Sequence, residues 1–252
     1  MITGIILAGG DGTRLKYQNA NKTTIPFNGK PLIQYGLDLF KDITDKIVIV
    51  VGAYPESVKA VVHSPAVIYA MQAERLGTGH AVQVAVAEME RQGLNPKTVM
   101  VGYGDHMMFY TKDIITQMLN LHQQKNAAMT LISTDHDDPN MLAWGRIIRD
   151  SAGHVLDIIE QKDATEEQRR MKELNTGFYC FDYAFLKQAL PLLNKSAHSG
   201  EIYLTDLVKV ANTAHQTVVA FKIPFEYVGI GINTPEQLLH SQTLHKEITH
   251  AA

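Results

Sequence analysis

The first thirty residues contain the clearest pattern in this chain for binding a phosphorylated ligand. The apolar run 5–8 predicts a strand. The small and basic residues that follow it are Gly9, Gly10, Gly12, Thr13, Arg14 and, a little later, Lys22. Glycines let backbone N–H groups approach an anion closely, a guanidinium binds phosphate through two hydrogen bonds, and an ammonium adds a compact positive charge. The pattern therefore predicts a loop that binds a nucleoside triphosphate.

Two better-known phosphate loops do not fit these residues. The P-loop requires a lysine directly after its second glycine, but Gly12 is followed by a threonine. The dinucleotide fingerprint requires a third glycine three residues after Gly12, where this chain has Leu15. The plainer alternative is a glycine turn after an edge strand. Arg14, Lys22 and the sequence 29–31, Gly-Lys-Pro, weigh against it.

The composition excludes several classes of protein. A net charge of −3 over 252 residues argues against a nucleic-acid partner, which usually requires a basic domain. The single cysteine, Cys180, rules out an intrachain disulfide framework and fits a reducing compartment. No run of about 18 apolar residues is present, so we expect no membrane span. We therefore expect a cytoplasmic protein that binds its anionic ligand through a local basic patch.

Strand-like and helix-like runs alternate through the first half of the chain. Strands are predicted at 2–8, 46–51, 66–70, 98–102 and 127–132, and helices at 31–41, 55–62, 79–92 and 112–125. This alternation predicts a Rossmann-like α/β fold, a mostly parallel sheet with helices on both faces. Ligands of such sheets bind at the carboxyl ends of the strands. The loop that contains Gly9, Gly10 and Gly12 (the glycine loop) and the pair Gly104-Asp105 should therefore face one crevice.

The pattern changes from about residue 139. A hairpin is predicted from 144–149 and 155–159, a charged helix at 163–173, a strand at 175–181, helices at 183–193 and 202–214, and a strand at 217–221. No Pro- or Ser-rich linker separates these elements from the first half. We interpret the chain as one domain, 1–252, with halves 1–135 and 136–252.

Several segments, taken in order, resemble the signature regions of the sugar-1-phosphate nucleotidyltransferases. They are LAGGDGTRL (7–15), IPFNGKPLIQY (25–35), MQAERLGTGHAV (71–82), VGYGDHMM (101–108), AWGRIIRD (143–150), the region 158–179, SGEIYLTDL (199–207) and GIGINTPEQL (229–238). Their order and spacing most resemble the N-terminal N-acetylglucosamine-1-phosphate uridylyltransferase domain of the GlmU family, bifunctional bacterial enzymes that make UDP-N-acetylglucosamine. The resemblance covers nearly the whole chain, and it implies that 1–135 binds the nucleotide and that a small β-rich region within 136–252 binds the sugar phosphate.

The resemblance also implies roles for single residues. Catalysis would rest on Arg14, Lys22 and Asp105, and Mg²⁺ on Asp105 and Asn233. The expected nucleotide-binding residues are Leu7, Ala8, Gly9, Gly10, Gly12, Thr13, Gln72, Gly77, Thr78 and Tyr103. The expected sugar-phosphate-binding residues are Gly145, Glu160, Asn175, Tyr203 and Thr205. Plainer alternatives are a turn or helix cap for Asp105, Asn233 and Thr78, a hairpin edge for Gly145, a solvated strand residue for Glu160, and core packing for Tyr203.

The implied reaction is Mg²⁺-dependent: UTP and N-acetylglucosamine 1-phosphate give UDP-N-acetylglucosamine and pyrophosphate. Two departures from the family pattern affect its specificity, since Asn21 replaces the usual Pro before the Lys and Gly9 replaces the second Ala of Leu-Ala-Ala-Gly. They leave open the same reaction with dTTP or GTP and another hexose 1-phosphate. A non-catalytic, regulatory module that binds a nucleotide-sugar is a further alternative.

The resemblance leaves the assembly of the protein open. No hexapeptide repeat occurs in these 252 residues, so we expect no acetyltransferase activity from this chain. A homo-oligomer, a separate acetyltransferase partner and the use of one or two metal ions are not decided by the sequence.

Overall fold

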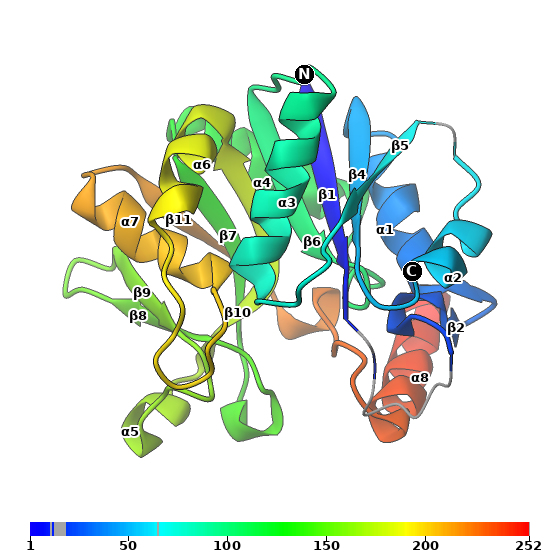
Figure 1. Ribbon diagram of the computed structural model, residues 1–252. Coiled ribbons are helices and arrows are strands. Elements are labelled where there is room, and N and C mark those ends of the chain that lie inside the picture. The colour runs from blue at the N-terminus through cyan, green and yellow to red at the C-terminus, as the bar shows by residue number, and fades with distance from the viewer. Residues whose placement is uncertain (11, 13–18, 65, 252) are drawn as a thin grey trace.

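A computed structural model describes residues 1–10, 12, 19–64 and 66–251 of the chain (Figure 1). Its central sheet has the strand order β11-β7-β10-β6-β1-β4-β5. The bounds of these strands are β1 Ile2–Ala8, β4 Lys46–Val51, β5 Val67–Met71, β6 Thr98–Tyr103, β7 Met129–Asp135, β10 Glu173–Asp182 and β11 Val218–Lys222. The mostly parallel α/β sheet that the sequence predicts is confirmed.

Along this strand order, β10 runs antiparallel to both of its neighbours. β1 pairs in parallel with β4 and β6, β4 with β5, and β7 with β11, whereas β10 is antiparallel to both β6 and β7. After β7 the chain builds a hairpin at the carboxyl edge of the parallel strands, so β10 starts at that edge and runs back. Asn175, near the start of β10, is therefore brought to the edge where β1 and β6 end.

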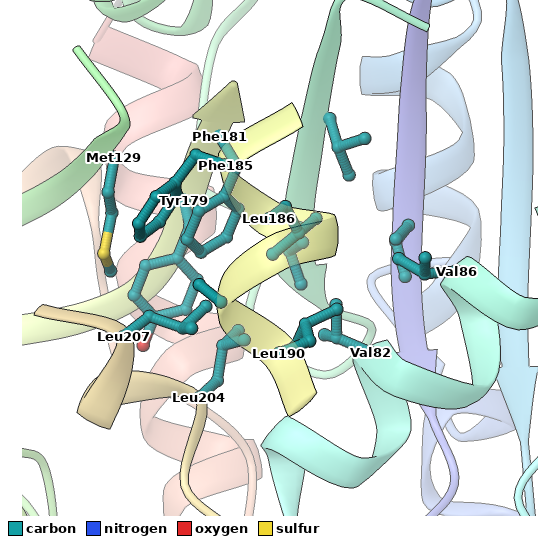
Figure 2. Close-up of a cluster of buried hydrophobic side chains, with 14 of the residues drawn as sticks. Val82, Val86, Met129, Tyr179, Phe181, Phe185, Leu186, Leu190, Leu204 and Leu207 are labelled. Carbon is teal, nitrogen blue, oxygen red and sulfur yellow. The ribbon is translucent and has the colours of Figure 1, made fainter. Parts of the chain in front are cut away.

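Helices cover both faces of the sheet (Figure 1). One face packs against α1 (Leu32–Phe40), α2 (Pro55–Val61) and α4 (Lys112–Gln124), the other against α3 (Thr78–Arg91), α6 (Tyr183–Ala189) and α7 (Leu207–Thr213). Alternate residues of a strand point to opposite faces, so Ile5 and Leu7 enter one core and Ile6 and Ala8 the other. Figure 2 shows part of the first core, where side chains of α3, β10 and α6 interlock.

The second half contains the predicted hairpin and two helices that differ from prediction. β8 (Arg146–Arg149) and β9 (Val155–Ile159) pair antiparallel. The helix predicted at 163–173 is the single turn α5, Glu166–Arg169, because none of its residues is buried and Glu173 already belongs to β10. The helix predicted at 202–214 starts only at Leu207, because the backbone of Ile202 pairs with Leu76 and Gly79 instead.

A third, smaller core fixes the C-terminal helix α8, Pro235–Ala251, beneath the sheet (Figure 1). The short strands β2 (Pro26–Phe27) and β3 (Lys30–Pro31) form the other wall of this core. Phe27, Phe109 and Ile232 are buried in it, and they hold the start of α8 close to the carboxyl end of β6. Within the described residues, no helix is both long and apolar enough to cross a bilayer.

We expect Gly177→Ala to destabilise the fold much more than Gly153→Ala. Both glycines have positive φ, 83° and 88°, a conformation that costs an alanine roughly 1–2 kcal/mol. An added Cβ at Gly177 would also collide with the ring of Tyr103, whereas at Gly153 it would meet nothing within 4 Å. Overpacking costs about 1–3 kcal/mol, so urea unfolding should show a difference of this size between the variants. Equal losses would contradict the packing that we describe at Gly177.

Candidate active site

A cavity of about 330 Å³ opens where β1 and β6 end. The predicted residues that line it are Leu7, Ala8, Gly9, Gly10, Lys22, Gln72, Gly77, Thr78, Tyr103 and Asp105. Residues that sequence reasoning did not single out also line it: Asn21 (noted only as a departure from the family pattern), Thr23, Arg75, Ala81 and Glu201. Gly12 is not among the lining residues. It has a positive φ of 64°, and an added Cβ would lie 2.9 Å from the Cβ of Lys22, so both backbone and space favour glycine there. Thr13 and Arg14 lie outside the described residues, so their roles stay predictions.

Three side chains from distant parts of the chain meet at this cavity. The Nζ of Lys22 lies 2.5 Å from Asp105 Oδ2 and donates a hydrogen bond to Asn233 Oδ1 at 3.2 Å. Lys22 opens a short 3₁₀ turn after the glycine loop, Asp105 follows β6, and Asn233 precedes α8. The side chains of Lys22 and Asp105 are only 17% and 15% exposed, so solvent screens their attraction less than at an open surface.

Neither Asp105 nor Asn233 caps the helix that follows it. The N-cap of α4 is Thr111, whose side chain accepts from Ile114 N, and Thr234 Oγ1 accepts from Gln237 N at the start of α8. The backbone of the loop before α8 is anchored by a hydrogen bond from Ile232 N to Asp105 O. The helix-cap alternative for both residues is therefore wrong, and their side-chain oxygens point to Lys22 instead.

The chemistry of this cluster suits a hard cation. A carboxylate oxygen and an amide oxygen both approach one ammonium, so the two oxygens are close enough together to face a single positive charge. Such oxygens are the ligands that Mg²⁺ takes from proteins, with water and substrate phosphates completing its shell. No group of three His, Cys, Asp or Glu side chains suited to a metal occurs in the part of the chain that the structure describes.

Gln72 forms the wall of the cavity that faces the glycine loop. Its Nε2 donates to Gly77 O at 3.0 Å and lies 3.2 Å from His80 Nδ1, and its side chain is buried. A Cβ added to Gly9 would lie 2.6 Å from Gln72 Oε1. The glycine at position 9 therefore lets Gln72 lie directly against the loop, which gives this departure from the family pattern a steric reason.

A second cavity, of about 200 Å³, adjoins the first. Its lining residues are Thr78, Tyr103, Ala143, Glu160, Gln161, Lys162, Glu201 and Tyr203, and three of them, Thr78, Tyr103 and Glu201, also line the first cavity. Two of the five residues expected to bind the sugar phosphate, Glu160 and Tyr203, thus line a space beside the expected nucleotide site.

The other three residues of that set stand behind the lining. Thr205 Oγ1 donates to Glu160 Oε1 at 2.9 Å, and Asn175 Nδ2 donates to the hydroxyl of Tyr179 at 2.7 Å. Gly145 O accepts from Asn175 N at 2.8 Å. These residues hold the lining in place in the structure, and direct contact between them and a ligand stays a prediction.

Burial changes the protonation behaviour of this second cavity. Desolvation of the Glu160 carboxyl raises its pKa, the Thr205 hydrogen bond opposes this, and the nearby carboxyls of Asp163, Asp206 and Glu201 raise it further. Burial also raises the pKa of Tyr103, whose hydroxyl is hydrogen-bonded to Tyr179 and Thr78. Tyr103 therefore stays a neutral hydroxyl where the two cavities meet.

Backbone hydrogen bonds join the walls of the two cavities. Ile202 N donates to Leu76 O at 2.7 Å, and Gly79 N donates to Ile202 O at 2.8 Å. Thr78 does not cap α3; its hydroxyl accepts from Leu204 N at 3.1 Å. A Cβ at Gly77 would lie 2.5 Å from Ile202 O, so this contact requires glycine there. The sequence offers no local pattern for this pairing, because its partners lie far apart in the chain.

Known proteins share this architecture. Residues 3–229 match the family model described as nucleotidyl transferase. The bifunctional protein GlmU of Thermoanaerobacter pseudethanolicus is 35% identical over 244 residues, which cover 96% of this chain and 51% of that protein. The bifunctional protein GlmU of Enterococcus faecalis is 38% identical over 230 residues, covering 91% and 48%. The chain thus spans about half the length of these curated relatives.

A solved structure supports the fold assignment. A putative glucose-1-phosphate thymidylyltransferase from Bacillus anthracis, crystallised with a sucrose, superposes with a TM-score of 0.75 at 21% identity, covering 98% of this chain and 96% of its own. At this identity the similarity concerns the fold alone. The family match over most of the chain and the relatives over almost all of it together show that this chain belongs to the nucleotidyl transferase family.

Proposed function

We propose that this chain transfers a nucleotidyl group from UTP to N-acetylglucosamine 1-phosphate and releases pyrophosphate. The observation that carries the proposal is the pair of adjoining cavities, one with Lys22 and Asp105 in its wall and the other with Glu160. An anionic nucleotide fits the first, because it has the basic side chain and the glycine backbone. A sugar fits the second, because its carboxyl and hydroxyl groups match sugar hydroxyls in hydrogen-bonding capacity.

The reaction needs positioning and charge neutralisation more than proton transfer. A phosphate oxygen of the sugar 1-phosphate attacks the α-phosphorus of the triphosphate, a new P–O bond forms, and pyrophosphate leaves with the electron pair of the broken bond. A phosphate monoester is already anionic near neutral pH, so no general base is required. Two substrates held in line in adjoining cavities gain most of the rate enhancement from orientation and electrostatics.

The residues of this chain divide that work between them. The backbone of Gly9 and Gly10 is open to the cavity and can approach the triphosphate closely. Lys22, with Arg14 as its predicted companion, would neutralise charge on the α-phosphate and on the departing pyrophosphate. A Mg²⁺ ion held by Asp105 and Asn233 would add positive charge beside the phosphate oxygens. Glu160, fixed by Thr205, would orient the sugar.

Two observations favour this substrate pair, and two others favour a different pair. The segments 71–82 and 174–179 resemble the uridylyltransferases of the GlmU family, and the curated relatives are named GlmU. The neighbour by fold is named a thymidylyltransferase, and Gly9 departs from the Ala of the Leu-Ala-Ala-Gly form. The second candidate is therefore the same reaction with dTTP and a different hexose 1-phosphate.

The substrate pair is tested by pyrophosphate release from UTP, dTTP, GTP, ATP and CTP, each with a panel of hexose 1-phosphates. We expect UTP with N-acetylglucosamine 1-phosphate to give the highest kcat/KM. A tenfold preference for dTTP would favour the second candidate. No release with any pair would remove the transferase proposal and leave a binding module.

Lys22→Ala and Asp105→Asn should lower activity in different ways. Loss of one preorganised electrostatic donor costs roughly 10²–10³ in kcat, which we expect for Lys22→Ala with its Mg²⁺ dependence retained. Asp105→Asn should instead raise the Mg²⁺ concentration needed for half-maximal activity, because a neutral amide is a weaker ligand for a hard cation. Lys59→Ala, which removes an exposed ion pair with Glu56 and a cation–π contact with Tyr69 away from both cavities, is the control. A wild-type Mg²⁺ response from Asp105→Asn would rule out the ligand role.

Glu160→Gln should weaken sugar binding while stabilising the fold at neutral pH. The pKa of the Glu160 carboxyl is higher in the folded state than in the unfolded state. Its protonation therefore stabilises the fold fully below the unfolded pKa, and this stabilisation is lost as the pH rises through the folded pKa. The amide keeps the acceptor for Thr205 without the buried charge. Loss of a charged hydrogen bond should raise KM for the sugar phosphate about tenfold or more.

Thermal melts across pH 4–8 measure the stability part of this prediction. The variant should melt above wild type at pH 8, and the gap should close as the pH falls. Glu247→Gln, on the exposed surface of α8, should show no such trend. A wild type that is more stable than Glu160→Gln at pH 8 would contradict the raised pKa.

A further inference from the structure

Asn21 makes an unusually complete set of hydrogen bonds for one side chain. It is fully buried, at 0% exposure. Its Nδ2 donates to Ala8 O at 2.8 Å, to Gly10 O at 2.9 Å and to Ala53 O at 2.9 Å. Its Oδ1 accepts from Thr23 N at 2.9 Å and from Thr23 Oγ1 at 2.8 Å. One amide group therefore satisfies both its donor and its acceptor sides inside the protein.

The three carbonyls that Asn21 binds belong to three segments at the carboxyl ends of β1 and β4. Ala8 ends β1, Gly10 lies in the glycine loop, and Ala53 lies in the loop between β4 and α2. Ala8 is in the last pair of the β1–β4 ladder, and Gly10 and Ala53 lie beyond it, so carbonyls at this edge need partners other than a continuing strand. The side-chain amide of Asn21 donates hydrogen bonds to these carbonyls where no further strand residues follow.

The acceptor side of the same amide shapes the turn that carries Lys22. The hydrogen bonds from Thr23 to Oδ1 begin the 3₁₀ turn Lys22–Thr24, and the main-chain oxygen of Asn21 accepts from Thr24 N at 3.0 Å. The backbone N of Asn21 donates to Ser57 Oγ at 2.9 Å, which ties the same residue to α2. A proline at this position would have neither the N–H nor the amide.

We propose that Asn21 is a positioning residue that holds the glycine loop and Lys22 in their reactive arrangement by clamping three carbonyls with one amide. The proposal deepens the proposed function, on which it rests. Asn21 touches no reacting atom in this account; it acts through the loop whose backbone faces the phosphates and through the turn that places Lys22 beside Asp105. It therefore governs nucleotide binding and turnover, and leaves sugar binding alone.

Asn21→Asp and Asn21→Ala remove the clamp in different ways. The carboxylate of Asn21→Asp would face three carbonyl oxygens and would repel them, whereas the amide donates hydrogen bonds to them. Only the protonated carboxyl group could again donate a hydrogen bond. Asn21→Ala removes the three hydrogen bonds to these carbonyls. Asn212→Ala is the matched control, because Asn212 Nδ2 also clamps two carbonyls, Val155 O and Leu156 O, but away from the two cavities.

The test measures pyrophosphate release with the best substrate pair, together with nucleotide binding by calorimetry. For Asn21→Ala we expect kcat to fall at least tenfold, the Kd of the triphosphate to rise at least fivefold, and KM for the sugar phosphate to stay within twofold. Asn212→Ala should leave all three unchanged even if its melting temperature drops. Asn21→Asp, in conditions where circular dichroism shows it folded, should recover activity relative to wild type as the pH falls.

The outcomes separate this inference from the proposed function. An active wild type with an Asn21→Ala variant that keeps wild-type kcat and Kd overturns the positioning role. An inactive wild type overturns the proposed function, and the Kd of the triphosphate alone then decides the role of Asn21: no change in Kd overturns it. If Asn21→Ala does not fold, Asn21→Ser, which keeps one hydroxyl donor, takes its place under the same criteria.

Discussion

The ammonium of Lys22 lies between the carboxylate of Asp105 and the amide oxygen of Asn233, and much of the fold serves to bring these three groups together. Each comes from a different source: the turn after β1, the end of β6 and the loop before α8. β1 and β6 pair side by side in parallel, which puts their carboxyl ends at one edge. Asn233 reaches that edge only because the small core around Ile232 and Phe109 fixes the start of α8. In the partly shielded site, opposite charges attract more strongly than they would in open water.

The reversed strand β10 has a comparable influence on the second cavity. Because the chain builds β8, β9 and α5 at the carboxyl edge before β10 begins, Glu160 and Asn175 end up beside the strand ends that form the first cavity. Tyr103, at the end of β6, lines both cavities and is hydrogen-bonded to Tyr179 of β10. The antiparallel pairing of β6 with β10 thus provides a common wall, and the backbone contacts of Ile202 with the segment 76–79 provide another.

Local patterns in the sequence predicted the features that depend on local physics. β-branched runs and helical periodicity gave the strands and the first four helices to within a few residues, and the glycine cluster with Lys22 and Asp105 gave the first cavity. Two helix predictions failed where distant partners decide: within 163–173 only the turn 166–169 is helical and it buries no residue, and Ile202 is held by a segment more than a hundred residues away. Ligand contact by Thr205 and Asn175 stays a prediction, and the structure adds supporting hydrogen bonds of these residues that no spacing rule could reveal.

The two departures from the family pattern, Gly9 and Asn21, meet in one small region of the structure. Asn21 binds the carbonyls on either side of Gly9, those of Ala8 and Gly10. Gly9 O accepts from Ala53 N, and Ala53 O in turn accepts from Asn21. On its other side Gly9 leaves room for Gln72 Oε1, which a Cβ would displace. The amide of Asn21 fixes the backbone on both sides of Gly9, and the missing Cβ of Gly9 leaves room for Gln72. The two departures from the family pattern are therefore structurally compatible with each other. Both residues therefore bear on the backbone around Gly9, and the glycine loop and Gln72, each expected to bind the nucleotide, are best understood as one structural unit.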